Sequence, residues 1–233
     1  IQPEPGHEVL VVDGFLLRHI QPLKNDTSME GISNHVVNGT EVPDITFDDI
    51  GGLDEVVKEI LQELRNPILV PEGYQQLDAP ASFSVILCGP PGNGKTLIAK
   101  AIANHAWQAD REKILLYAKG NFLAVLGPEL HDKYWGEAER KLREVIEGAQ
   151  KLHKLSGAQV FIFFHDCESL FPNRGGEGYN FSGNNDMVNQ FNTLVDGLFK
   201  LEGVCLIAAT NRLDKMDPAV RRRFSCEYFI SGP

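Results

Sequence analysis

Apolar runs of strand length alternate with longer segments of helical periodicity through most of this chain. The runs lie at residues 84–89, 121–127, 160–164, 204–210 and 226–230. The run at 160–164, Val-Phe-Ile-Phe-Phe, is continuously apolar, which is typical of a strand buried on both faces of a sheet. Strands that alternate with helices predict an α/β fold with a parallel sheet between two helical layers.

The segments between the runs predict the helices. A helix over 54–65 is indicated by apolar residues at helical spacing, namely Val56, Val57, Ile60, Leu61 and Leu64. Further helices are expected from Lys95 to about Trp107, from residues 133–137 to about Leu155, and over 186–199. Residues 174–185 are rich in Gly and Asn, and we expect a loop there.

The first forty residues follow a different pattern. Two short apolar stretches within residues 8–20 flank Asp13-Gly14, a strong turn pair, so residues 1–20 are predicted to form a β-hairpin. This hairpin is either the remnant of an N-terminal β-barrel domain or a hairpin packed on the main domain. Residues 21–43 are polar and lack periodicity, which predicts a linker before a main domain at 44–233.

A phosphate-binding loop follows the first strand of the main domain. Residues 89–96 read G-x-x-x-x-G-K-T, with a strand before them and a helix after them. Glycines let the backbone N–H groups of such a loop point inward at a polyphosphate, and the helix adds its positive N-terminal end. Lys95 offers a charge to the β- and γ-phosphates, and Thr96 offers a hydroxyl to Mg²⁺. The residues expected to hold the nucleotide are Pro91, Gly92, Asn93, Gly94, Lys95, Thr96 and Leu97.

Composition narrows the class of protein. Hydrophobic residues make up 42% and charged residues 23%, as in soluble globular proteins, and no apolar run is long enough to cross a bilayer. The net charge of −10 repels phosphate backbones, which argues against a nucleic-acid partner. The four cysteines lie far apart, without a zinc or disulfide pattern, and we expect reduced thiols in a cytoplasmic protein.

Polar residues follow the later strands, where a hydrolytic site would be completed. The third strand runs into His165-Asp166-Cys167-Glu168 and the fourth into Thr210-Asn211-Arg212. The basic run at 221–223 follows Asp217-Pro218. Hydrolysis of a nucleoside triphosphate requires an acid near Mg²⁺, a group that orients water, and positive charge for the transition state. The ends of parallel strands bring such groups to one edge of the sheet.

With these motifs in order, residues 44–233 resemble the large nucleotide-binding subdomain of an AAA ATPase, with most similarity to proteasomal and valosin-containing-type unfoldases. The resemblance implies a P-loop three-layer sandwich around a five-stranded parallel sheet. It also implies that Asn211 places the attacking water and that Arg222 and Arg223 act as arginine fingers on a neighbouring subunit. The residues that the resemblance places beside the adenine are Asp49, Ile50 and Gly51, and those that it places on a substrate-gripping pore loop are Tyr134, Trp135 and Gly136.

The sequence departs from the family pattern in two places. The family's Walker B strand ends in Asp-Glu, whereas His165 and Asp166 stand there, in a register fixed by residues 169–172. A neutral imidazole brings no negative charge to Mg²⁺, so Asp166 is the expected acid for both metal and water, although it is one methylene shorter than Glu. The sequence also ends at Pro233, directly after the fifth strand, so we expect it to lack the family's small helical lid subdomain.

Two functional hypotheses follow. In the first, the protein binds ATP and Mg²⁺ and hydrolyses ATP slowly, as a cytoplasmic homo-hexamer that unfolds or translocates protein substrates with a protease or adaptor partner. In the second, it is a nucleotide-binding, hydrolysis-deficient structural or regulatory subunit. Asn211, Arg222 and Arg223 favour the first hypothesis, and the His165-Asp166 pair favours the second. Neither hypothesis includes a nucleic-acid or membrane partner.

Overall fold

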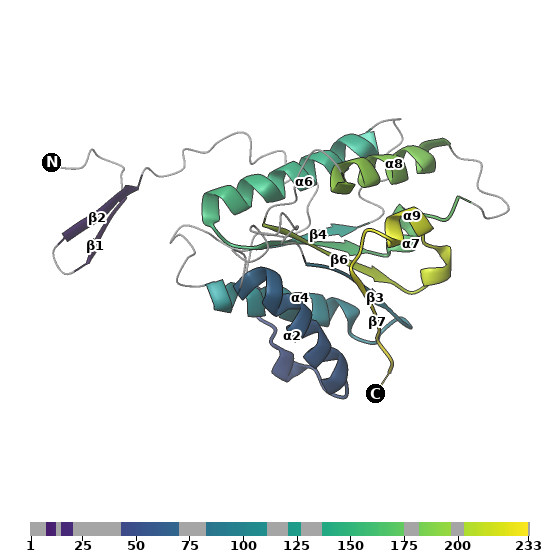
Figure 1. Ribbon diagram of the computed structural model, residues 1–233, viewed down its shortest axis with the longest axis horizontal. Coiled ribbons are helices and arrows are strands. Elements are labelled where there is room, and N and C mark those ends of the chain that lie inside the picture. The colour runs from purple at the N-terminus through teal and green to yellow at the C-terminus, as the bar shows by residue number, and fades with distance from the viewer. Residues whose placement is uncertain are drawn as a thin grey trace.

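The computed structural model describes residues 8–12, 15–20, 43–69, 83–110, 121–126, 137–174, 182–196 and 203–232 (Figure 1). The predicted pore residues Tyr134, Trp135 and Gly136 lie outside these ranges, as does nearly all of the predicted linker. Within the described part, no helix combines the length and the apolarity needed to cross a membrane.

A five-stranded parallel sheet forms the centre of the main domain. Its strands, in the spatial order β4-β5-β6-β3-β7, are β4 (Phe122–Leu126), β5 (Val160–His165), β6 (Val204–Thr210), β3 (Ser84–Cys88) and β7 (Cys226–Phe229). Every residue of β3 and β6 is buried, as expected for strands in the middle of a covered sheet. The predicted α/β fold and its five parallel strands are therefore confirmed.

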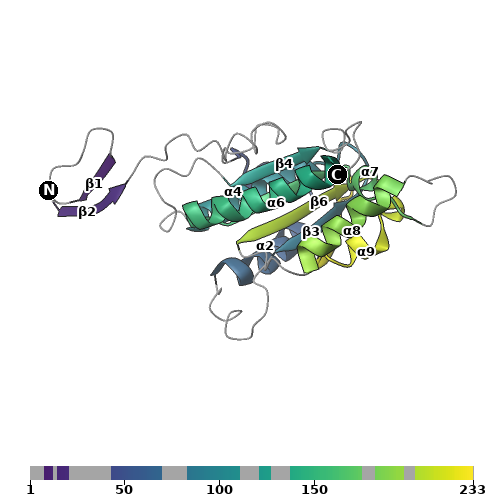
Figure 2. The same ribbon diagram turned by 90° about the horizontal axis from the view of Figure 1, so that it is seen from above.

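Helices cover both faces of this sheet (Figure 1). On one face lie α2 (Asp54–Leu69) and α4 (Lys95–Asp110), and on the other lie α6 (Glu137–Ser156) and α8 (Ser182–Asp196), which Figure 2 shows lying over the strands. Alternate residues of β5 enter the two cores, because side chains of a strand point to opposite faces. Phe161 and Phe163 pack with the α4 side, whereas Ile162 and Phe164 pack with the α6 side.

Three helices differ in their boundaries from the predicted ones, and one of them, α4, continues past Trp107 to Asp110. The α8 helix begins at Ser182, so residues 182–185, expected to be loop, are helical; residues 197–199 at its predicted end lie outside the described part. The α2 helix continues past residue 65 to Leu69. Gly and Asn have weak intrinsic helix propensity, and the packing of α8 against α6 overrides it.

Four short elements lack any periodic signal in the sequence. They are the 3₁₀ helices η1 (Phe47–Asp49) and η2 (Leu213–Lys215) and the four-residue helices α7 (Cys167–Leu170) and α9 (Pro218–Arg221). Each spans a single turn, which is too short for an apolar stripe to be recognised. Both α7 and α9 carry residues of the candidate site.

The N-terminal strands β1 (Glu8–Val12) and β2 (Phe15–Ile20) pair antiparallel, which confirms the predicted hairpin. Its origin in a barrel domain stays a prediction. In the main domain, none of the four cysteines is in a disulfide, and Cys88, Cys167 and Cys205 are buried, as expected for reduced thiols.

Candidate nucleotide-binding site

The loop between β3 and α4 begins with a glycine at a position that leaves no room for a side chain. The backbone N–H of Gly89 donates to the carbonyl of Thr210 (3.2 Å), and Ile230 N–H donates to the carbonyl of Cys88 (2.7 Å). Gly89 has φ +154°, and a Cβ atom there would lie 2.2 Å from the carbonyl oxygen of Ile230. The loop is therefore pressed against the chain that leaves β7, and a side chain would force the two apart.

The next two glycines curl the loop. Gly92 and Gly94 have φ of +83° and +80°, in the left-handed region that glycine adopts without strain. A Cβ built on Gly92 would meet no atom within 4 Å, so open space borders the loop at this position. Asn93 donates from Nδ2 to the carbonyl of Ile230 (3.1 Å), which fastens the tip of the loop to the segment after β7. A curled backbone at a helix N-terminus, with open space beside it, fits a polyphosphate.

Lys95 stands at the first position of α4, and its ammonium is held inside the loop. Nζ donates to the carbonyls of Gly89 (2.8 Å) and Pro90 (2.7 Å), and only 9% of the residue is exposed. Burial lowers the pKa of Lys95, and the negative charges of Glu168 and Asp166 oppose that shift. The next residue, Thr96, is half-buried, and Leu97 is exposed.

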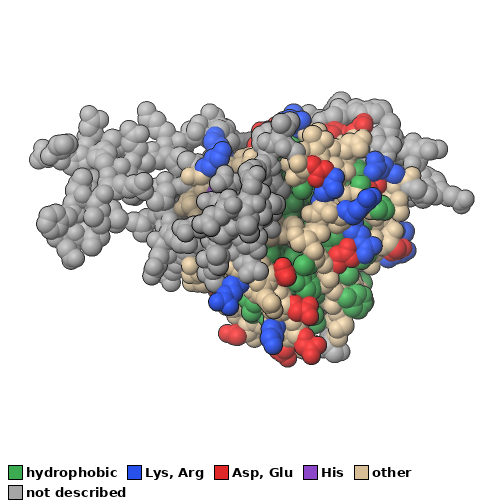
Figure 3. Space-filling view, in the orientation of Figure 1, with side chains coloured by type: hydrophobic (Ala, Val, Ile, Leu, Met, Phe, Trp, Pro, Cys, Tyr) green, Lys and Arg blue, Asp and Glu red, His purple; other side chains and the backbone are tan. Residues whose placement is uncertain are grey.

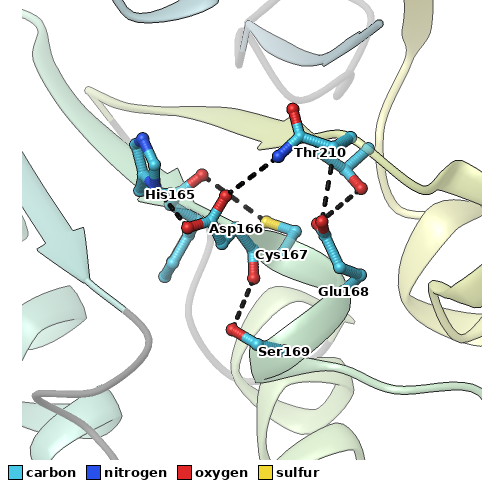
Figure 4. Close-up of polar contacts among 8 residues, drawn as sticks. His165, Asp166, Cys167, Glu168, Ser169 and Thr210 are labelled. Carbon is cyan, nitrogen blue, oxygen red and sulfur yellow. Dashed lines mark hydrogen bonds and ion pairs between the residues drawn. The ribbon is translucent and has the colours of Figure 1, made fainter. Parts of the chain in front are cut away.

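Three residues predicted to be catalytic meet at the carboxyl edge of the sheet, and Figure 4 shows two of them, His165 and Asp166. His165 Nδ1 lies 2.9 Å from Oδ2 of Asp166, and Asn211 donates from Nδ2 to Oδ1 of the same carboxylate (3.5 Å). Asp166 has φ +52° and is the non-glycine residue with a left-handed backbone in the described part of the chain. Such a conformation costs energy and is concentrated at functional sites.

Glu168, to which we gave no role from the sequence, also reaches this edge. Its carboxylate accepts a hydrogen bond from Oγ1 of Thr210 (2.6 Å) and another from the backbone N–H of Asn211 (3.3 Å) (Figure 4). The signal that could have revealed it is its place two residues after Asp166, directly beyond the strand end. The structure shows that α7 supplies one acidic group of this site, Glu168, while Asp166 is the N-cap residue between β5 and α7.

The segment before α2 is anchored on the P-loop helix. Asn104 of α4 donates to the carbonyl of Ile45 (3.0 Å), and Phe47 packs edge-to-face on His105 with ring centroids 5.7 Å apart. Ile50 packs against the core on the α4 side. This anchoring fixes the residues predicted to border the adenine to the same helix that starts at the P-loop.

Asp49 and Gly51, two of the residues predicted to border the adenine, have distinct surroundings. The carboxylate of Asp49 accepts hydrogen bonds from the backbone N–H (2.8 Å) and the hydroxyl (3.0 Å) of Thr46, and these bonds lower its pKa. Asp49 therefore caps η1 with its side chain. Gly51 is exposed, and a Cβ there would meet nothing within 4 Å.

The three consecutive arginines at α9 have different partners. Arg221 forms an ion pair with Glu227, and Arg223 forms one with Asp196 at the end of α8. Arg222 is exposed and donates only to the carbonyl of Pro218 (3.2 Å); among the described residues no carboxylate pairs with it. Figure 3 shows Lys and Arg side chains interspersed with Asp and Glu over the region of α8 and α9. Arg222 is thus the arginine of the three whose charge is free for a partner.

A buried carboxylate holds α9 in place. Asp217, 1% exposed, accepts from the backbone N–H of Ala219 (2.8 Å) and from Nε of Arg174 (2.8 Å). The backbone N–H of Asp217 in turn donates to the carbonyl of Phe171 (2.8 Å), just beyond α7. The start of α9, the helix that ends at Arg221, is therefore tied directly to the segment that follows α7.

The parallel sheet and the glycine loop at its carboxyl edge define a P-loop nucleotide-binding domain. Residues 85–231 match the profile of the ATPase family associated with various cellular activities (AAA). This match spans more than half of the chain, and the chain therefore belongs to the AAA family of ATPases.

Several relatives within the family are similar to most of this chain. An "AAA ATPase forming ring-shaped complexes" of Micrococcus luteus is 40% identical over 220 residues, covering 91% of this chain and 36% of that protein. A protein of the same description from Bifidobacterium dentium is 41% identical over 182 residues (78% of this chain, 33% of that protein). A "Proteasome-associated ATPase" of Renibacterium salmoninarum is 42% identical over 183 residues (78% and 30%). The chain spans about a third of the length of these relatives.

Proposed function

We propose that this chain is the nucleotide-binding domain of a ring-forming ATPase, that it binds Mg²⁺-ATP at residues 89–97, and that it hydrolyses ATP slowly. One observation carries the proposal: the glycine-lined loop and its buried lysine lie at the same edge of the sheet as the hydrogen-bonded pair Asp166 and Asn211. Binding and hydrolysis each have their own residues in this arrangement, and each can be tested separately.

The loop residues supply the binding. Mg²⁺-ATP, when bound, supplies a transferable γ-phosphoryl group and a divalent cation. The backbone N–H groups of the curled loop and the N-terminus of α4 attract phosphate oxygens. Lys95 exchanges two neutral carbonyl acceptors for charged oxygens, which makes stronger, charge-assisted hydrogen bonds. Thr96 presents its hydroxyl to the cation at the start of the helix.

The residues at the strand ends carry out the hydrolysis of ATP, and we expect the rate to be low. Asp166 is the carboxylate that accepts a proton from water, and Asn211 orients that water with its amide. His165 engages one oxygen of Asp166 and, when neutral, adds no negative charge near the cation. Displacing a general base from its ordinary position costs about 10²–10⁴-fold in rate, which is the reason for expecting slow turnover.

The larger assembly is proposed from the names of the relatives. Those names describe ring-shaped complexes and association with a proteasome. By analogy, we infer a cytoplasmic homo-hexamer that unfolds or remodels protein substrates, with a protease or adaptor as partner. The second candidate is a nucleotide-binding subunit that does not hydrolyse ATP, and the pairing of His165 with Asp166 is the observation that favours it.

Phosphate release from the full-length protein with Mg²⁺-ATP separates the two candidates. Lys95→Ala provides the background, since it removes the charge inside the loop. Turnover of the natural sequence above that background is the expected result, with a higher rate in His165→Asp/Asp166→Glu. If only this restored pair turns over, the protein is a nucleotide-binding subunit and the hydrolysis proposal is wrong.

Binding of a fluorescent ATP analogue tests the loop independently of turnover. Lys95→Ala should weaken binding by about 10²-fold, because the phosphates lose their charge-assisted hydrogen bonds to the lysine. Lys100→Ala is the matched control, because Lys100 lies on the same helix, outside the loop. Equal affinities of Lys95→Ala and the natural protein would contradict the site.

A further inference from the structure

We propose that Glu168 is a positioning residue for ATP hydrolysis, whose carboxylate holds Asn211 in the orientation in which its amide reaches Asp166 and the attacking water. The proposal rests on the proposed function and adds a residue to it. The argument starts from the two hydrogen bonds that this carboxylate accepts, one on each oxygen.

Glu168 joins the ends of two neighbouring strands. It lies in the first turn of α7, which follows β5 after a single residue, whereas Thr210 is the last residue of β6. Its Oε2 accepts from Oγ1 of Thr210 (2.6 Å) and its Oε1 from the backbone N–H of Asn211 (3.3 Å). The contacts bridge 42 and 43 positions of sequence. Both donors therefore lie at the end of β6, and the acceptor lies just beyond the end of β5; Figure 4 shows Thr210 and Glu168 in these places.

The backbone around Asn211 depends on these two contacts. The hydroxyl of Thr210 donates its hydrogen to Glu168 and accepts from the backbone N–H of Arg212 (3.0 Å), so the carboxylate fixes the direction of the hydroxyl. Asn211 itself is exposed, and its amide meets Asp166 at 3.5 Å, a long hydrogen bond. Packing does little to orient an exposed side chain, so the backbone bond to Glu168 is what aims it.

The negative charge of Glu168 lies close enough to the P-loop to act on Lys95, which agrees with a role at this edge of the sheet. Of the charges near Lys95, that of Glu168 raises the lysine's pKa most, ahead of that of Asp166. Glu168 is half-buried beside fully buried Thr210, where a carboxylate that lost its two donors would be left without compensation. Both hydrogen bonds described for this carboxylate run to the end of β6, so the role we assign to Glu168 is exerted through Thr210 and Asn211.

A double-mutant cycle in the full-length protein tests this. Glu168→Ala and Asn211→Ala are each expected to lower kcat by roughly 10–100-fold, the cost of misplacing a catalytic group by about 1 Å. The double variant should be no slower than Asn211→Ala alone, because residues that act as a unit are not additive. KM should stay within about twofold of the natural value, since the phosphate-binding loop is unchanged. Asp214→Asn is the matched control: it removes an exposed carboxylate three residues beyond Asn211 and should leave kcat unchanged.

The ratio of ATP to ADP affinity, measured by competition with a fluorescent nucleotide, gives a readout without turnover. Asn211 and Glu168 variants should change this ratio by the same factor, and the double variant by no more. If the natural protein shows no ATP turnover above that of Lys95→Ala, the proposed hydrolysis is disproved. The ratio of ATP to ADP affinity then still tests whether Glu168 positions Asn211. Glu168→Gln keeps one acceptor oxygen and nearly the same shape. Its ratio of ATP to ADP affinity should therefore lie between those of Glu168→Ala and the natural protein.

Three outcomes would overturn the proposal. In the first, the effects of Glu168→Ala and Asn211→Ala multiply in the double variant, which means that Glu168 acts independently of Asn211. In the second, Glu168→Ala lowers the unfolding temperature and both affinities equally while the ratio stays constant, which is the behaviour of a purely structural contact. The third is unchanged turnover and an unchanged ratio in Glu168→Ala. If Glu168→Ala does not fold, Thr210→Val and Glu168→Gln replace it in the same double-mutant comparison with Asn211→Ala.

Discussion

The guanidinium of Arg223 forms an ion pair with Asp196 at the end of α8, 27 positions earlier in the chain. Both partners are partly exposed, and the pair ties the segment after α9 to the helical layer on the α6 side. Adjacent Arg222 makes no such pair with any described residue and donates only to the carbonyl of Pro218. Two arginines that the sequence predicts to act alike therefore differ in whether their charge is already engaged.

This difference predicts unequal effects of substitution. Arg222→Ala should lower ATP turnover of the assembled protein by about 10³-fold, the contribution typical of an arginine finger, while the subunit's own ATP affinity is kept. Arg223→Ala should cost less, because its guanidinium must first leave Asp196. Steady-state phosphate release above the assembly concentration measures both, with Arg221→Ala, which loses only its pair with Glu227, as the matched control. Equal losses for Arg222→Ala and Arg223→Ala would show that the ion pair has no bearing on the choice of finger.

Long, strongly patterned elements of this fold were predictable, and short ones were not. The runs at 84–89 and 204–210 predicted β3 and β6 to within a residue, because buried strands must be apolar throughout. The P-loop was predictable because its chemistry requires particular residues at fixed spacing in one continuous segment. The single-turn helices α7 and α9 have no periodicity to recognise. Contacts such as that of Glu168 with Thr210 join residues 42 positions apart, which a local pattern cannot reveal.

Gly89→Ala should destabilise the fold and the loop together. The added Cβ would lie 2.2 Å from the carbonyl oxygen of Ile230, and that oxygen belongs to the backbone and cannot turn aside. We expect a loss of roughly 1–3 kcal/mol in the free energy of unfolding, the usual range for backbone strain, with weaker ATP binding. Urea unfolding measures the first and nucleotide titration the second. Gly51→Ala is the control, since its Cβ meets nothing within 4 Å, and a comparable loss there would refute the steric explanation.

The pore-loop prediction concerns Tyr134 and Trp135, which lie outside the described residues and stay a hypothesis from the sequence. If Tyr134 grips a translocating polypeptide, Tyr134→Ala should leave basal ATP turnover unchanged and abolish unfolding of a fluorescent protein substrate. Tyr134→Phe keeps the aromatic ring and should preserve unfolding. Unfolding that persists in Tyr134→Ala would remove the residue from the substrate path.

Asp217 should make stability depend on pH in the acid range. Its burial raises its pKa, but the hydrogen bonds from the Arg174 side chain and the Ala219 backbone outweigh burial, and the net shift is below the ordinary value of 3.8. Because the unfolded chain binds the proton more readily, this carboxylate contributes stability above its unfolded pKa and loses it as pH falls through the lower folded pKa.

Asp217→Asn tests this linkage, since it keeps the size of the side chain and removes its titration. At pH 7 it should lower the free energy of unfolding by about 1–3 kcal/mol, the cost of leaving buried partners of a charged group unsatisfied. The gap between Asp217→Asn and the natural protein should begin to narrow below about pH 4, where Asp217 of the unfolded chain binds its proton, and should keep narrowing as the pH falls through the lower folded pKa. Urea unfolding at a series of pH values measures the gap. Asp214→Asn, which breaks the exposed pair with Arg212, should show a much smaller effect at every pH. If the difference in the free energy of unfolding between Asp217→Asn and the natural protein stays constant from pH 7 to pH 3, the ionised form of Asp217 does not contribute the stability that we assign to it.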